Sequence, residues 1–152
     1  MGRMGDLPDP QLCEQVIIPA DPVAVRAGLR ALFDTLLLRS LPEDGRGTAE
    51  IVLAEALNNI VEHAYSRHDG EIEITLRLRG PDLVCSIRDN GLPMPNGLLP
   101  AGRLVALSST DDLPEGGFGW FLIRSLSQDL DYQRVEGRNC LSFRLCTNQS
   151  AP

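Results

Sequence analysis

A regular alternation of apolar and polar residues in the middle of the chain is the strongest guide to its fold. Between Glu71 and Arg79, every second residue is Ile or Leu, and the residues between them are Glu, Thr or Arg. This period of two predicts a β-strand with one buried face and one face in water. Because only one face of such a sheet needs cover, we expect helices on a single side of it.

The segments around this strand supply the other elements of both layers. In chain order we predict a strand at 12–18, amphipathic helices at 21–39 and 48–65, strands at 71–79 and 83–89, a long loop at 90–117, a helix at 118–127, and a hairpin at 129–136 and 140–146 around G-R-N. The break L-P-E-D-G-R-G separates the first two helices. This order predicts an α+β fold, a two-layer α/β sandwich with a mostly antiparallel sheet.

Length and charge exclude several classes of protein. With 152 residues, the chain is expected to hold a flexible leader at 1–11, a single domain at 12–147 and a tail at 148–152. Its 14 basic and 21 acidic residues give a net charge of -7, which disfavours direct binding of nucleic acid or anionic lipid. All 14 basic residues are Arg. Without lysine, a Walker P-loop, a Schiff-base site and the lysine–phosphate contact of eukaryotic-type protein kinases are excluded.

The sequence carries no sign of membrane insertion or export. No stretch approaches the roughly 18 apolar residues of a membrane span. The N-terminal segment M-G-R-M-G-D-L-P-D-P lacks an apolar signal core. We therefore expect a cytoplasmic protein without a membrane partner.

The first group of candidate functional residues lies on the second predicted helix, in E-A-L-N-N-I-V-E-H-A. Glu55, Asn59 and His63 recur at four-residue steps and therefore share one face of the helix. An amide oxygen is a hard ligand suited to Mg²⁺, and a carboxylate one turn away can orient or deprotonate a nucleophile. The alternative is that Glu55 and Asn59 are only the solvated edge of an amphipathic helix.

Two further groups follow the strand at 83–89. In I-R-D-N-G-L-P, Asp89 stands where the strand ends and Gly91 frees the backbone, so a carboxylate could accept the exocyclic amine of adenine. D-N-G is equally an ordinary turn. In E-G-G-F-G-W-F-L-I, Gly117 and Gly119 open a helix whose first N–H groups attract phosphate. The third glycine of the dinucleotide fingerprint is missing there, and glycine-rich loops before helices are common.

The order and spacing of the three groups resemble the Bergerat-fold ATPases of the GHKL superfamily. The closer resemblance is to anti-sigma-factor serine kinases of the partner-switching type. In that comparison E-A-L-N-N corresponds to the N box, D-N-G-L-P to the first glycine box, and G-G-F-G-W-F-L-I to the second. The resemblance extends from Leu12 to Leu145, and this fold does not require a lysine-bearing P-loop.

The resemblance implies a role for each polar residue of the motifs. Asn59 would coordinate Mg²⁺, Glu55 would act as the base or activator, and Asp89 would read the adenine of ATP. His63 and Tyr65 match positions that often follow the N box, and we expect packing or capping roles for both.

The glycines of the motifs would let ATP approach the backbone. By resemblance, Gly91 lies beside the adenine, and Gly117 and Gly119 admit the phosphates. Pro93 departs from the pattern of the wider superfamily, which has a second glycine there, and should stiffen the start of the loop. Trp120 replaces a smaller apolar residue and is expected to fill the core.

The resemblance implies an ATP-dependent protein serine kinase that holds a sigma factor and phosphorylates a STAS-domain anti-anti-sigma factor, as a homodimer. The loop from Met94 to Gly116 is expected to close as a lid on the γ-phosphate through Arg103 and Ser108–Thr110. Alternatives are a nucleotide-binding regulator without kinase activity and a module that binds only protein. The catalytic half of a histidine kinase is disfavoured because no dimerisation hairpin presents a phosphoacceptor histidine.

Overall fold

A computed structural model describes residues 13–101 and 117–147, which form one sheet and the helices that cover it. The strands are β1 (Cys13–Pro19), β2 (Glu71–Arg79), β3 (Asp82–Asp89), β4 (Gln128–Val135) and β5 (Arg138–Cys146). The helices are α1 (Pro22–Leu32), α2 (Leu36–Arg39), α3 (Glu43–Asn59), the π-helix η3 (Ile60–Ala64), the 3₁₀ turn η4 (Pro95–Gly97) and α4 (Gly117–Leu126).

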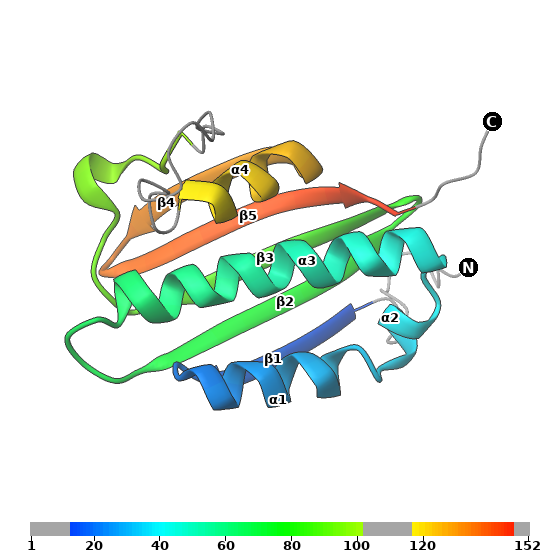
Figure 1. Cartoon of the computed structure of the whole chain (residues 1–152), viewed down its shortest axis with the longest axis horizontal. Helices are drawn as coiled ribbons and strands as arrows, with labels where there is room; N and C mark the ends of the chain where they lie inside the picture. The colour runs from blue at the N-terminus through cyan, green and yellow to red at the C-terminus, as the bar shows by residue number, and fades with distance from the viewer. Residues whose placement is uncertain (1–12, 102–116, 148–152) are drawn as a thin grey trace, which may run out of the picture.

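The five strands form an antiparallel sheet in the order β1-β2-β3-β5-β4. Helices α1, α3 and α4 lie side by side across one face of it (Figure 1). The alternation in β2 has the predicted consequence, since Ile72, Ile74 and Leu76 are fully buried beneath these helices. The other face of the sheet carries no helix of the described chain. The predicted two-layer α+β sandwich is therefore confirmed.

The first predicted helix is interrupted, which corrects the prediction of one helix over 21–39. The chain leaves α1 after Leu32 and starts again as α2 at Leu36. Thr35 explains the break: its hydroxyl donates to the Leu32 carbonyl at 2.7 Å and accepts from the Leu38 N–H at 3.5 Å. A threonine side chain that bonds to the end of one helix and to the start of the next favours two separate helices over a continuous one.

The second helix begins earlier than predicted, and its last turn is a π-helix. Instead of starting at Thr48, α3 starts at Glu43, where acidic residues favour the positive end of a helix. Gly45, in the first turn of α3, packs closely against Thr147, because a Cβ there would lie 2.5 Å from the Thr147 carbonyl oxygen. After Asn59 the helix widens into η3, and the Tyr65 N–H donates to the Ile60 carbonyl at 3.1 Å.

The final hairpin turns at two residues, Glu136 and Gly137, with φ of 52° and 80°. Positive φ at both positions is typical of a two-residue type I′ turn. Arg138 and Asn139 belong to β5, so the prediction that G-R-N forms the turn is wrong for these two residues. Asn139 is only 5% exposed and lies on the same face of β5 as the buried Leu141.

The long loop is described as far as Ala101, with η4 as its only regular turn in that part. The predicted lid residues Arg103 and Ser108–Thr110 lie outside the described residues, as do the predicted leader at 1–11 and tail at 148–152. Within residues 13–101 and 117–147, every helix is too short or too polar to cross a membrane.

Candidate active site

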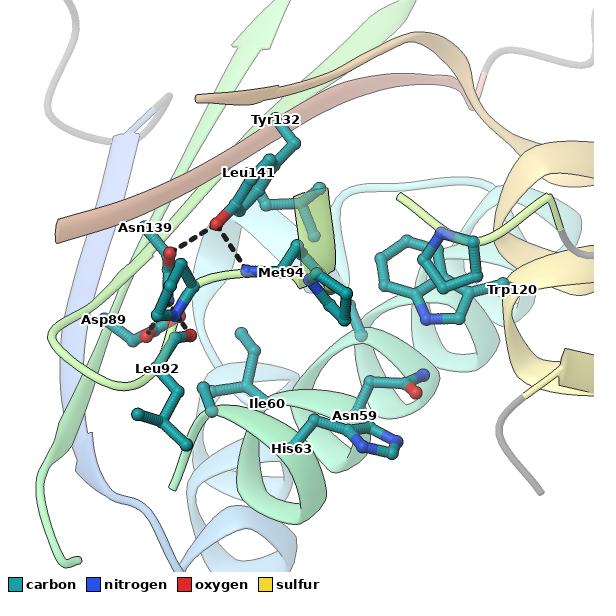
Figure 2. A pocket seen from close by; sticks show the side chains of 15 residues that line it. Asn59, Ile60, His63, Asp89, Leu92, Met94, Trp120, Tyr132, Asn139 and Leu141 are labelled. Carbon is teal, nitrogen blue, oxygen red and sulfur yellow. Dashed lines mark hydrogen bonds between the residues drawn. The ribbon is translucent and has the colours of Figure 1, made fainter. Parts of the chain in front are cut away.

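A cavity of about 380 Å³ lies where the end of α3, η3, the loop after β3, the start of α4 and the β4–β5 hairpin meet. Figure 2 shows its wall. The polar side chains in the wall are Asn59, His63, Asp89, Tyr132 and Asn139, and the other described lining residues are apolar or aromatic. This volume and this mixture are typical of small-molecule sites, which span roughly 300 to 1,000 Å³.

Asn59, the last residue of α3, has an unusual hydrogen-bonding state. Its side chain is 4% exposed, and Nδ2 donates to the Glu55 carbonyl at 2.8 Å. A carbonyl only accepts, so this bond identifies the other amide atom as Oδ1. Across the described residues, Oδ1 is the one buried side-chain oxygen or nitrogen without a partner. An unpaired buried acceptor costs about 1 to 3 kcal/mol, so a cation or donor from a bound molecule would stabilise it.

Glu55 lies one turn before Asn59 but meets different surroundings. It is half-buried and is not part of the cavity wall. A Cβ at Gly119 would lie 2.5 Å from Glu55 Oε1 and 3.3 Å from Asn59 Nδ2. The structure therefore brings Glu55, Asn59 and Gly119 together, with the start of α4 against the two polar side chains. The solvated-edge alternative is wrong for Asn59, which is buried.

Asp89 ends β3 inside the cavity wall and is 3% exposed. Its Oδ1 accepts hydrogen bonds from the Gly91 N–H at 2.8 Å and from Asn139 Nδ2 at 2.7 Å. No hydrogen bond from the described part of the chain reaches Oδ2. Burial raises the pKa of Asp89, while the Asn139 and Gly91 hydrogen bonds and the cationic Arg134 and Arg138 oppose that rise. The Asp89 side chain thus keeps one oxygen, Oδ2, for a donor from a bound molecule.

Gly91 serves the packing of the loop and is not among the residues of the cavity wall. A Cβ at this position would lie 2.3 Å from the Ala64 carbonyl oxygen and 2.6 Å from its carbon. The next residue, Leu92, donates its N–H to the same oxygen at 2.7 Å. The D-N-G turn is also present, because the Gly91 N–H closes on Asp89 Oδ1. Glycine is therefore required for close contact with η3.

Gly91→Ala should destabilise the fold by about 1 to 3 kcal/mol, because the atoms in its way belong to backbone that cannot rotate aside. The matched control is Gly47→Ala. Gly47 lies within α3 with nothing within 4 Å of its would-be Cβ, so alanine there should stabilise by about 0.5 to 1 kcal/mol. Urea unfolding of both variants measures the difference. A Gly91→Ala protein as stable as wild type would contradict the packing role.

Three residues of the hairpin were missed as site residues in the sequence. Tyr132 donates its hydroxyl to Asn139 Oδ1 and accepts the Met94 N–H at 2.9 Å. Arg134 Nη1 donates to the Gly91 carbonyl at 2.7 Å and to Asn139 Oδ1 at 3.0 Å. A signal for Asn139 was available, because the alternation of buried residues in β5 extends back to it. The prediction that G-R-N forms the turn left Asn139 out of the strand.

The aromatic residues near the motifs have mixed roles. Trp120 is 2% exposed and belongs to the core as predicted, but it also lines the cavity. Tyr65 is buried, and its hydroxyl donates to the Glu71 carbonyl and accepts the Asn90 N–H, each at 2.7 Å. His63 stands in the cavity wall with an exposed side chain, rather than packing in the core.

Sequence comparison gives relatives with named activities. The histidine kinase-like ATPase domain family matches residues 18–145. The chain is 39% identical over 111 residues to the serine/threonine-protein kinase BtrW of Bordetella bronchiseptica, over 70% of this chain and 72% of BtrW. It is 34% identical over 94 residues to the serine-protein kinase RsbW of Bacillus mycoides, over 60% of this chain and 59% of RsbW.

Solved structures agree on the fold. The RsbU and RsbW domains of a Mycobacterium tuberculosis protein match with a TM-score of 0.60 and 15% identity, over 88% of this chain and 32% of that one. The blue-light activated histidine kinase of Erythrobacter litoralis matches with a TM-score of 0.55 and 15% identity, over 83% of this chain and 40% of that one. At this identity the likeness concerns fold alone.

The family match covers both the α3–η3 segment and the strands that carry Asp89 and Asn139. This family match confirms the predicted superfamily. The predicted class, a protein serine/threonine kinase, agrees with the names of the relatives BtrW and RsbW. The chain belongs to the histidine kinase-like ATPase family, and its relatives include the serine/threonine-protein kinase BtrW and the serine-protein kinase RsbW.

Proposed function

We propose that this chain binds Mg²⁺-ATP in the cavity and transfers the γ-phosphoryl group to a serine of a partner protein. The observation that carries the proposal is the unpaired, buried Oδ1 of Asn59 in the wall of a ligand-sized cavity. An amide oxygen is a ligand that Mg²⁺ accepts, usually alongside phosphate oxygens and water. The family match to ATPase domains supports the same nucleotide.

The two ends of the cavity suit the two ends of ATP. Asp89 and Asn139 lie together at the sheet, and Asn59 stands on the helices beneath (Figure 2). Asp89 Oδ2 would accept the exocyclic amine of adenine. Asn59 would hold Mg²⁺, which supplies charge neutralisation at the phosphates, and the first N–H groups of α4, from Gly117 to Gly119, would face the phosphates.

Glu55 is the proposed base. Its carboxylate would take the proton of the attacking serine hydroxyl as the bond from serine oxygen to the γ-phosphorus forms and the bond to the β,γ-bridging oxygen breaks, which releases ADP. The start of α4 lies against Glu55 at Gly119, which places the proposed base beside the N–H groups proposed to face the phosphates. The reaction leaves a phosphoserine on the partner and a proton on Glu55.

The names of the relatives, serine/threonine-protein kinase BtrW and serine-protein kinase RsbW, support a serine substrate. We further propose that the substrate is a STAS-domain anti-anti-sigma factor, that a sigma factor is the second partner, and that the chain acts as a cytoplasmic homodimer. The domain proposed to do this spans residues 12–147.

A second candidate function is a nucleotide-binding regulator without phosphoryl transfer. One observation favours it: Glu55 is absent from the described wall of the cavity and contacts the start of α4 instead. The test is to incubate the purified chain with γ-labelled ATP, Mg²⁺ and STAS-domain proteins from its host. Label on a serine supports the kinase. ATP binding without label on any of them favours the regulator, and absence of ATP binding overturns both.

ATP should bind roughly ten- to a hundredfold more tightly than GTP, because guanine would place an oxygen opposite Asp89 Oδ2 and leave two acceptors unpaired. Asp89→Asn should reduce this preference for ATP over GTP. Its Oδ1 can still accept from Gly91 and Asn139, while its Nδ2 would face guanine as a donor. Competition calorimetry with ATP and GTP measures both proteins. Equal affinities in wild type would remove Asp89 from base recognition.

A further inference from the structure

Asn139 stands directly opposite Asp89 across the β3–β5 pair and is hydrogen-bonded on every side. Its Nδ2 donates to Asp89 Oδ1 at 2.7 Å and to the Leu92 carbonyl at 2.8 Å. Its Oδ1 accepts from the Tyr132 hydroxyl and from Arg134 Nη1. The side chain is 5% exposed, and both of its polar atoms are satisfied within the protein.

These partners allow only one orientation of the amide. A guanidinium can only donate, so the atom beside Arg134 must be the oxygen. The Leu92 carbonyl can only accept, so the atom beside it must be the nitrogen. The nitrogen therefore has to face Asp89, and a flip of the amide would break contacts to both Arg134 and Leu92. Asn139 is a fixed donor, built into the strand next to the carboxylate.

The consequence for Asp89 concerns its two oxygens. Oδ1 is occupied by two donors, Asn139 Nδ2 and the Gly91 N–H. Rotation of the carboxyl group would lose both, so the group keeps a defined orientation and Oδ2 a defined position. The same network holds the start of the loop, through Arg134 to the Gly91 carbonyl and Tyr132 to the Met94 N–H.

We propose that Asn139 is the positioning residue of base recognition, holding the Asp89 carboxyl group oriented so that its Oδ2 receives the amine of adenine. This inference rests on the proposed ATP site and adds a determinant from the opposite strand. Other groups near Asp89 are Arg134 on β4 and Arg138 on β5, both cationic, and Tyr65 after η3. Each of them has a hydrogen bond that does not involve Asn139: Arg134 donates to the Gly91 carbonyl, Arg138 to Glu73, and Tyr65 to the Glu71 carbonyl.

Asn139→Asp tests the role because it keeps the shape and replaces the donor by a carboxylate. Two carboxylates at this distance repel each other when both are ionised, and they share a proton when one is not. At about pH 8.5 the variant should bind ATP roughly ten- to a hundredfold more weakly than wild type, because an acceptor now faces Oδ1. As pH falls towards about 5.5, uptake of one proton restores a donor, and the deficit should shrink to about threefold or less.

The ATP affinity of the wild-type protein should depend on pH in the opposite direction. Its ATP affinity should be full at high pH and fall only as Asp89 becomes protonated at low pH. His63 lines the same cavity and would affect all variants alike, so the ratio of variant to wild-type affinity at each pH removes its contribution. The control is Tyr132→Phe, which removes the hydroxyl's hydrogen bonds with the Met94 N–H and with Asn139 Oδ1 but leaves Arg134 to orient Asn139. Its pH profile should follow that of wild type.

A second variant keeps the inference testable if Asn139→Asp does not fold. Asn139→Val removes the donor without adding charge, so the fall in ATP affinity on acidification should begin at higher pH than in wild type. A carbon-detected NMR titration of the Asp89 carboxyl in nucleotide-free protein gives the same comparison without ATP. If wild type binds ATP and both variants show the same dependence of ATP affinity on pH as wild type, the role of Asn139 is overturned but the proposed function is not. A wild type that does not bind ATP would instead overturn the proposed function.

Discussion

Glu55→Gln should lower the rate of phosphoryl transfer by about 10²- to 10⁴-fold, the usual contribution of a general base. Glutamine keeps the shape of the side chain and its contact with the start of α4, but it cannot take a proton from serine. Affinity for ATP should stay within about twofold of wild type, because the lost interaction belongs to the transition state. Single-turnover transfer from γ-labelled ATP measures the rate. The emission of Trp120, which is the single tryptophan and lines the cavity, provides the binding signal.

Glu62→Gln is the matched control for this experiment. Glu62 lies on η3 with its side chain 64% exposed, and it is not part of the described cavity wall. Its neutralisation should change neither transfer nor binding. If Glu55→Gln lost transfer and ATP affinity to the same extent, Glu55 would have a structural role in the site. Full activity in Glu55→Gln would mean that another group accepts the proton of the serine hydroxyl.

The strands could be read from the sequence because the burial of each strand residue depends mainly on which face it occupies. The alternation over Glu71 to Arg79 coincides with β2, and the predicted helix after the glycines coincides with α4 to within a residue at each end. The interruption of the first predicted helix has a different, local cause. Thr35 divides one predicted helix through two hydrogen bonds of its own hydroxyl, which apolar periodicity does not register.

The site was only partly predictable, because its residues owe their roles to neighbours distant in the chain. The four-residue step placed Glu55 and Asn59 on one face of α3, as predicted. That step could not indicate that Gly119 would lie against Glu55, or that Asn59 would be buried. Asn139 matters because strand pairing sets it opposite Asp89, fifty residues earlier in the chain. Such cross-strand pairs require the register, which follows from the complete sheet.

Asn59→Leu should abolish the Mg²⁺-dependent part of ATP binding without harming the fold. Loss of a residue that only supports a metal ligand commonly costs about 10- to 100-fold in affinity, so loss of the proposed ligand itself should cost at least about 100-fold. Leucine has nearly the same shape as asparagine and fills the same space. It also removes the unpaired Oδ1, whose burial costs about 1 to 3 kcal/mol. The nucleotide-free variant should therefore be at least as stable as wild type in urea unfolding.

The adjacent residue provides the control, since Asn58 is exposed on the same helix and Asn58→Leu should leave Mg²⁺-ATP affinity unchanged. The two measurements on Asn59→Leu separate binding from folding. Lower stability would indicate that the hydrogen bond from Nδ2 to the Glu55 carbonyl outweighs the unpaired oxygen. Unchanged affinity in a stable variant would remove Asn59 from the metal site. A more stable protein that has lost Mg²⁺-ATP identifies the unpaired oxygen as a strain on the fold that the bound cation relieves.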